Sequence, residues 1–201
     1  SSGSKYIISS DPIQAATDLQ AFAGILKTHD KVLLTAATGT GKTQSIISIL
    51  KSELLTPGIY ESIGIEKTIL AVPYNSFDQV TEKVKQYAGY DAYFVNGKST
   101  PHEINHAAGS RFMIVTYDSL PKIGHLLKDS LFVIDEIHLP GIESGFRFKA
   151  SETIFKAIQD EKKVLVMSGP PPLELAVGSQ LTVIDSKLTA LFNFHMVRFE
   201  S

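Results

Sequence analysis

The 201-residue sequence contains no cysteine. Disulfides, zinc sites built on cysteine, thiol catalysis and cysteine-held iron–sulfur clusters are therefore excluded. The absence of cysteine fits a cytoplasmic or other reducing intracellular compartment, which we take as the expected location. The sequence also has no apolar run near the roughly 20 residues that span a bilayer, so no membrane partner is expected.

An excess of basic residues is missing as well. The chain has 19 Lys and Arg against 21 Asp and Glu, which gives a net charge of −2. A broad electrostatic surface for nucleic acid is therefore not predicted, whereas local phosphate contacts from backbone amides and helix ends remain open.

Apolar residues make up 43% of the chain, which is enough for one well-buried domain of ordinary size. We expect residues 5–201 to form this single domain. The start, Ser1–Ser4, lacks the apolar core of a signal peptide and is interpreted as an expression scar.

Short apolar, β-branched runs alternate with amphipathic segments, which predicts an α/β fold with a mostly parallel sheet and helices on both faces. The expected strands are Val32–Thr35, Thr68–Val72, Ala92–Val95, Phe112–Thr116, Leu131–Ile134, Val164–Met167 and Leu181–Ile184. Helical spacing is present at Lys42–Leu55 and Ser76–Tyr87. The expected loops are Thr56–Glu66, Asn96–Pro101, Leu139–Arg147 and Gly169–Pro172. Leu191–Phe199 is either a last strand or the exit toward a further domain.

The strongest motif is a glycine-rich segment between the first expected strand and the first expected helix. It reads Ala36-Ala37-Thr38-Gly39-Thr40-Gly41-Lys42-Thr43 and is followed by Gln44. Gly39 and Gly41 permit the dihedrals that turn successive N–H groups toward an anion, and the helix adds its positive N-terminal end. Lys42 would reach the β- and γ-phosphates of a bound nucleotide, and the Thr43 hydroxyl would ligate Mg²⁺. The alternative is a plain strand–helix turn that contains glycine.

A second motif follows the apolar strand Leu131–Ile134 and reads Asp135-Glu136-Ile137-His138. Ligands of parallel sheets lie at the carboxyl ends of the strands. Asp135 is therefore expected beside the phosphate loop, where it would hold Mg²⁺, and Glu136 would orient or deprotonate the attacking water. The alternative is that both carboxylates only begin a solvated loop.

These motifs resemble those of superfamily 2 helicases and translocases. Ala36–Thr43 matches the A-x-T-G-x-G-K-T form of the family's phosphate loop, and Asp135–His138 is an instance of its DExH box. Leu70–Gln79 and Ile114–Leu120 are similar to two further motifs, and Ser168-Gly169-Pro170 stands where the family has Ser-Ala-Thr. The resemblance covers roughly residues 30–185 and implies a RecA-like first motor domain that hydrolyses ATP with Mg²⁺.

The resemblance also implies roles for individual residues. Lys42 and Glu136 would be catalytic, and His138 would couple the γ-phosphate to another domain, unless it is only a surface histidine. Ser168 and Gly169 would link hydrolysis to movement. Contacts with single-stranded DNA or RNA would come from Pro73, Asn75, Ser76, Thr116, Tyr117 and Ser119. Tyr74-Asn75 replaces the family's Thr-Arg, so one positive contact is missing.

The implied activity is ATP-driven translocation on nucleic acid, or its unwinding. The family also uses a second RecA-like domain that supplies arginine fingers. The only arginines here are Arg111, Arg147 and Arg198, in no Q-x-x-G-R-x-x-R pattern. We expect that domain in a longer chain or a partner, and weak hydrolysis by this domain alone, since an arginine finger contributes about 10³–10⁵ in rate. The alternatives are a P-loop ATPase that drives a protein machine or packaging, and a nucleotide-dependent binding module.

Several other signals have two interpretations. His102–His106 spells H-E-x-x-H, but a capping box at Thr100 and Glu103, with Pro101 in the first turn, is favoured over a zinc site. Asn96-Gly97-Lys98 is a predicted turn rather than a nucleic-acid contact, and Lys162-Lys163 a solvated turn rather than a basic patch. Gln14 is a weak candidate for adenine recognition. Tyr74, Tyr117 and Phe77 are candidates for stacking on bases, with Phe77 favoured as core.

Overall fold

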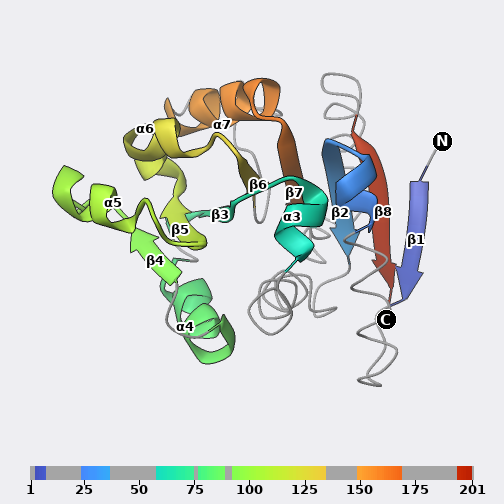
Figure 1. The fold of residues 1–201 in the computed structure, drawn as a ribbon, viewed down its shortest axis with the longest axis horizontal. Coiled ribbons are helices and arrows are strands. Elements are labelled where there is room, and N and C mark those ends of the chain that lie inside the picture. Colours follow the sequence, from blue (N-terminus) through green and yellow to red (C-terminus); the bar gives the residue numbers. More distant parts are fainter. Residues whose placement is uncertain are drawn as a thin grey trace, which may run out of the picture.

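In the part of the chain that the structure describes, a single eight-stranded sheet forms the centre of the domain (Figure 1). The computed structural model describes residues 3–7, 24–36, 58–74, 77–88, 92–134, 149–168 and 194–200. The strands run in the order β1-β8-β2-β7-β6-β3-β5-β4, and every neighbouring pair is parallel. Their bounds are Gly3–Ile7 (β1), Lys31–Ala36 (β2), Lys67–Val72 (β3), Ala92–Val95 (β4), Phe112–Thr116 (β5), Ser130–Ile134 (β6), Lys163–Ser168 (β7) and His195–Glu200 (β8). The predicted α/β class and parallel sheet are confirmed.

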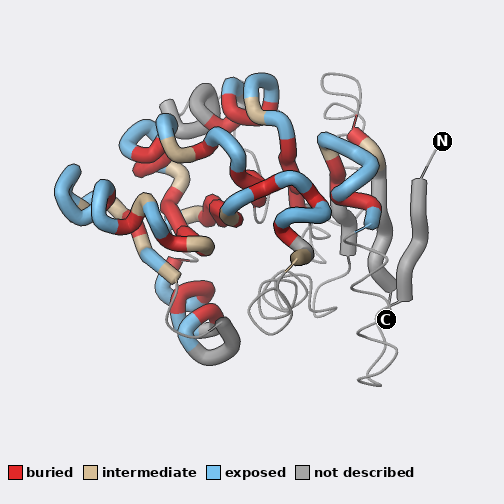
Figure 2. Tube along the Cα trace, in the orientation of Figure 1, coloured by how far each residue is buried: buried red, intermediate tan, exposed pale blue. Residues whose placement is uncertain are grey.

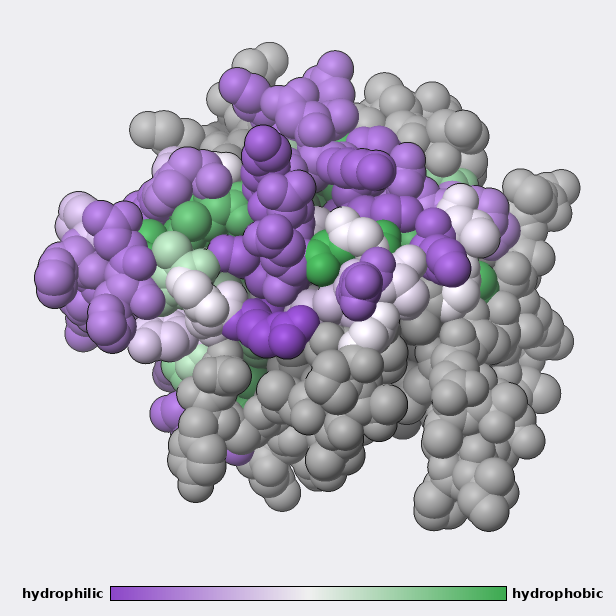
Figure 3. Space-filling model, in the orientation of Figure 1, coloured by the Kyte–Doolittle hydropathy of each residue, from purple (hydrophilic) through white to green (hydrophobic). Residues whose placement is uncertain are grey.

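Helices cover the sheet on both faces, as the alternating pattern predicted. They are residues 24–28, Ile59–Ile63 (α3), Phe77–Ala88 (α4), Pro101–Ala107 (α5), Leu120–Ile123 (α6) and Lys149–Asp160 (α7), with 3-10 turns at Tyr117–Ser119 (η2) and Gly124–Leu126 (η3). Successive strand residues point to opposite faces: in β3, Leu70 packs in the apolar cluster under α3 and α4, and Ile69 packs in the cluster under α5, α6 and α7. Figure 2 shows the buried strands between helices whose outer sides are exposed, and hydrophilic residues dominate the described surface of the face in Figure 3.

Six expected strands match β2 to β7, and the strand alternative for the tail is confirmed by β8. The expected helix Lys42–Leu55, strand Leu181–Ile184, loops Leu139–Arg147 and Gly169–Pro172, and Gln14 lie outside the described residues. The edge strand β1 was not predicted. It includes Gly3 and Ser4, whose backbones pair with Met196 and Val197 of β8.

The predicted loop Thr56–Glu66 is wrong in its middle, because α3 lies there. This five-residue helix is flanked by Gly58 at φ 132° and Gly64 at φ 86°, and Gly64 N donates to the Tyr60 carbonyl at 2.9 Å. A left-handed glycine after the last turn is a common helix stop. The Tyr60 ring is buried, and its hydroxyl lies 2.8 Å from Thr68 Oγ1 of β3. One and a half turns are too short to show helical periodicity in the sequence.

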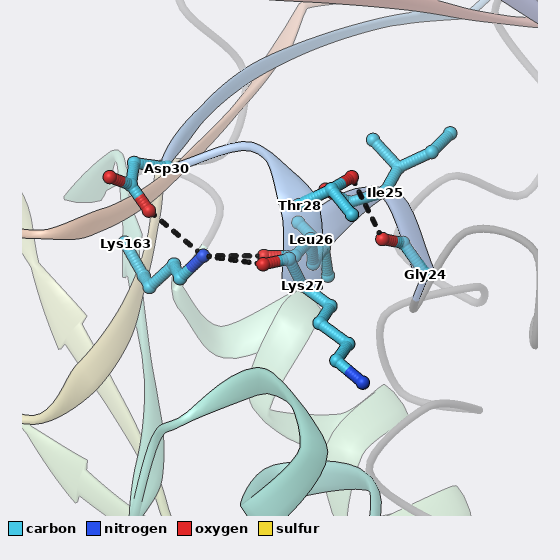
Figure 4. A network of polar contacts seen from close by, with 7 residues as sticks. All are labelled: Gly24, Ile25, Leu26, Lys27, Thr28, Asp30 and Lys163. Carbon is cyan, nitrogen blue, oxygen red and sulfur yellow. Dashed lines mark hydrogen bonds and ion pairs between the residues drawn. The ribbon is translucent and has the colours of Figure 1, made fainter.

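The predicted solvated turn at Lys162-Lys163 is correct only for Lys162, which is exposed. Lys163 begins β7, and its side chain is only 7% exposed. Its ammonium donates to the Leu26 carbonyl at 2.8 Å and the Lys27 carbonyl at 3.2 Å, and it pairs with the Asp30 carboxylate at 2.9 Å (Figure 4). The carbonyls at the end of a helix lack partners within the helix, so Lys163 caps residues 24–28 from β7, the strand next to β2.

Candidate functional site

The candidate nucleotide site lies at the carboxyl edge of three adjacent strands. β2 ends at Ala36, β6 ends at Ile134, and β7 ends between them at Ser168. The register pairs Thr35 with Ser168, and Ile134 with Val166, so the ends of the three strands are level within three residues. The strands that lead into the phosphate loop and the DExH box are two strand spacings apart, roughly 10 Å measured across the sheet.

This arrangement suits a nucleoside triphosphate with its metal. Both motifs start at one edge of the sheet, and together they contain an ammonium, a hydroxyl and carboxylates. The hydroxyl and carboxylate oxygens are the kind of ligand that Mg²⁺ prefers. Residues 37–44, 135–138 and 169 themselves lie outside the described part of the chain. The roles of Lys42, Thr43, Asp135, Glu136 and His138 thus stay predictions that the strand ends support.

The predicted nucleic-acid residues follow the neighbouring strands β3 and β5 at the same edge. Val72 of β3 pairs with Thr116 of β5, so the loops after these strands start side by side. The Thr116 hydroxyl donates to Ser119 Oγ at 2.9 Å, and both residues are buried. The two hydroxyls therefore hold the loop in shape, and a nucleic-acid strand would meet the peptide backbone of this loop. The roles of Pro73, which is half-buried, and of Asn75 and Ser76, which lie outside the described residues, stay predictions.

The three aromatic candidates differ in exposure. Phe77 is only 8% exposed and packs in the cluster under α3 and α4, which confirms its assignment to the core. Tyr117 is half-buried against the opposite cluster. Tyr74, directly beyond the end of β3, is 75% exposed, so its ring is the best placed of the three to meet a base.

The predicted turn at Asn96-Gly97-Lys98 is confirmed, at the carboxyl end of β4. Lys98 N donates to Asn96 Oδ1 at 2.9 Å, and Ser99 N donates to the Asn96 carbonyl at 3.1 Å. Sequence reasoning missed Lys122 of α6, whose ammonium lies 3.0–3.3 Å from the carbonyl oxygens of Asn96, Gly97 and Ser99. No local pattern marks this contact, because it joins segments that follow different strands.

The H-E-x-x-H segment forms the predicted capping box. Glu103 N donates to Thr100 Oγ1 at 3.2 Å, Thr100 N donates to Glu103 Oε1 at 3.3 Å, and Pro101 is the first residue of α5. His102 and His106 line an open cavity of about 280 Å³ between β4 and α5. Within the described residues, no group of three or more His, Asp or Glu side chains is placed to hold a metal ion.

The shifted pKa values lie at the opposite, amino end of the strands. The hydrogen bond from Lys163 lowers the pKa of Asp30, and burial lowers the pKa of Lys31, whose ammonium donates to the Ile158 carbonyl. Burial raises the pKa of Glu161. Burial, and then the charge of His29, lower the pKa of His195. Among the described residues these shifts follow from structural contacts, not from the candidate site.

The fold has counterparts among solved structures. The chain is similar to the Hef helicase domain of Pyrococcus furiosus (TM-score 0.61, 16% identity, 91% of this chain and 37% of that one). It is also similar to the SWI2/SNF2 ATPase core of Sulfolobus solfataricus, solved with dsDNA (TM-score 0.57, 16% identity, 96% of this chain and 45% of that one). A third similar structure is a hypothetical ATP-dependent RNA helicase of Sulfolobus tokodaii (TM-score 0.54, 18% identity, 90% of this chain and 51% of that one). The domain thus has the RecA-like fold of helicase motor cores, and it spans about half or less of these chains.

The sequence itself matches the family model for DEAD/DEAH box helicases over residues 12–176. The chain belongs to the DEAD/DEAH box helicase family. A comparison with curated proteins gives no match. No helix in the described part of the chain is long and apolar enough to cross a membrane.

Proposed function

We propose that this chain is the first motor domain of a DExH-type superfamily 2 helicase or translocase, which couples ATP hydrolysis to movement on single-stranded DNA or RNA. The observation that carries this proposal is the order of strand ends along one edge. The phosphate loop and the DExH box follow β2 and β6, on either side of β7, and the segments similar to the family's nucleic-acid motifs follow β3 and β5.

Each motif residue has a chemical task in this proposal. Lys42 binds the β- and γ-phosphates, Thr43 and Asp135 hold Mg²⁺, and Glu136 orients or deprotonates the attacking water. When bound, Mg²⁺ neutralises charge on the phosphate oxygens. Ser168 ends the strand between the two loops, a place suited to sensing both.

The two halves of the edge meet between β6 and β3. Ala71 of β3 pairs with Ile134 of β6, so the loop that begins at Asp135 starts one strand away from Pro73 and Tyr74. A nucleic-acid strand across β3 and β5 would lie next to the nucleotide site, which suits a motor. We further propose that a second RecA-like domain, in a longer chain or in a partner, completes the site with arginine fingers.

The test is an ATPase assay on the full-length protein with single-stranded DNA, single-stranded RNA and duplexes. We expect stimulation by at least one of them. Glu136→Gln should still bind ATP but lose about 10²–10⁴ in turnover, the usual contribution of a positioned base. Glu66→Gln is the matched control, because Glu66 is exposed just before β3 at the opposite end of the strand.

Three results would contradict parts of this proposal. Normal turnover in Glu136→Gln would remove that residue as the water-activating group. No stimulation by any nucleic acid would favour an ATPase that drives a protein machine or packaging. No calorimetric affinity for any nucleoside triphosphate with magnesium would remove the nucleotide site altogether.

A further inference from the structure

We propose that Lys122 is a positioning residue for nucleic-acid binding. Its ammonium fixes the turn of residues 96–99 to α6, so that the loops after β4 and β5 meet the nucleic-acid strand as one preformed surface. This inference rests on the proposed function, because it assumes that nucleic acid crosses this edge of the sheet.

The geometry of the contact is complete. The Lys122 ammonium donates to the carbonyl oxygens of Gly97 at 3.0 Å, Ser99 at 3.2 Å and Asn96 at 3.3 Å. An ammonium group has three N–H donors and no acceptor, so three converging carbonyls use its full capacity. The Lys122 head group is therefore engaged with the protein, which assigns it a positioning role rather than a direct phosphate contact.

The two segments that Lys122 joins differ in how well they are anchored. Lys122 lies between Leu120 and Ile123, which are both fully buried against the sheet, so α6 is held by apolar packing. In the turn, Gly97 and Lys98 are exposed and Asn96 is half-buried. The turn thus has little apolar contact of its own, and polar bonds decide its place.

Each loop is also shaped internally. In the turn, Asn96 N donates to Ser99 Oγ at 3.0 Å, and the capping box at Thr100 follows directly. In the loop after β5, the bond between Thr116 and Ser119 fixes η2 just before α6. β4 and β5 are neighbours in the sheet, with Val95 paired to Val115. Lys122 therefore ties together two preformed loops at adjacent strand ends.

Loss of the Lys122 contact should weaken nucleic-acid binding, because the turn of residues 96–99 would spend less time in the conformation that binds nucleic acid. If the untied turn is competent about a tenth of the time, the apparent Kd rises about tenfold, because apparent affinity scales with that fraction. Lys122→Met keeps most of the aliphatic stem and removes the ammonium. Lys122→Arg restores a cation that can donate to several carbonyls.

The experiment uses the full-length protein and a fluorescent single-stranded oligonucleotide, with Kd measured by anisotropy at several salt concentrations. The control is Lys128→Met, which makes the same charge change at an exposed lysine before β6, at the opposite end of the strands. Hydrogen–deuterium exchange of residues 94–100 reports the turn itself. The KM for ATP gives a readout that nucleic-acid positioning should not move.

The proposal predicts four results together. Lys122→Met raises Kd about tenfold with an unchanged salt slope, exchange quickens in residues 94–100, the KM for ATP stays the same, and Lys122→Arg recovers most of the affinity. If the slope of log Kd against log salt concentration falls by about 0.7, Lys122 makes a direct phosphate contact instead, and the positioning role is overturned. A Kd equal to that of Lys128→Met would also overturn it. Failure of the unmodified protein to bind any oligonucleotide would instead count against the proposed function.

Discussion

Replacement of Lys163 by methionine tests whether a buried ammonium stabilises this fold. The substitution keeps an unbranched apolar side chain of similar length, so the packing of the stem is largely preserved. It removes the hydrogen bonds to the carbonyls of Leu26 and Lys27, at 2.8 and 3.2 Å, and the ion pair with Asp30 at 2.9 Å. The helical residues 24–28 and the start of β7 then lose their polar connection.

The expected magnitude follows from these contacts. Two hydrogen bonds from a charged donor contribute about 3–6 kcal/mol together. The Asp30 side chain is 60% exposed, so its ion pair adds only about 0–1 kcal/mol after solvent screening. Methionine recovers the desolvation cost of the ammonium, which is several kcal/mol. We therefore expect a net loss of about 2 kcal/mol in the free energy of unfolding, or about 4–8 °C in Tm for a chain of this size.

Urea and thermal unfolding followed by circular dichroism measure this loss. Lys162→Met is the matched control, because it makes the same charge change at the adjacent exposed position. The control should stay within about 0.5 kcal/mol of the unmodified chain. Equal stability of Lys163→Met and Lys162→Met would refute the reasoning, since it would mean that the three contacts only offset the cost of burying the charge.

Three further predictions concern other described side chains. Tyr74→Ala should weaken binding of a single-stranded oligonucleotide about 5- to 150-fold, since stacking contributes about 1–3 kcal/mol per base. The chain has no tryptophan, so a single tryptophan introduced as Tyr74→Trp can report the stack through its fluorescence. The oligonucleotide should quench the fluorescence of Tyr74→Trp but not that of the control Tyr93→Trp. Equal quenching of both variants would argue against the stack. Thr100→Ala should lower the free energy of unfolding by about 1 kcal/mol through loss of the capping box; a urea midpoint equal to that of Thr100→Ser would contradict this. The pKa of His195 is lowered below its ordinary 6.5, first by burial and then by His29, so its neutral ring stabilises the fold above pH 6.5, and this stability is lost as the pH falls below that value. His29→Phe keeps a ring in the stack, in which the centroids lie 3.8 Å apart, and should reduce the loss of stability at acid pH. The urea midpoint of each protein is measured near pH 7.5 and near pH 5.5. An equal fall of the midpoint between these pH values in both proteins would count against the assignment.

The central strands were predictable because each carries its signal locally. β3 and β6 are buried on both faces, so their sequences are nearly continuous apolar runs. The capping box of α5 was equally local, since all its partners lie within three residues. α3 was missed because five residues give no periodic signal, although Gly58 and Gly64 mark its two ends.

The polar contacts between segments far apart in the sequence were not predictable. Lys163 and Leu26 are 137 residues apart, and Lys122 and Gly97 are 25 apart. No spacing rule relates such positions, so Lys163 was expected in a solvated turn and Lys122 was overlooked. For the candidate site, the motifs indicate that each loop follows a strand, but only the strand order shows which loops are neighbours.

That order places the proposed nucleotide site and the proposed nucleic-acid site side by side. Ala71 and Ile134 share one rung of the ladder between β3 and β6, so the two loops that emerge there start about 4.8 Å apart. In the proposed motor, a change in one of these loops on ATP hydrolysis would therefore reach the neighbouring loop directly, without passing through the core of the sheet.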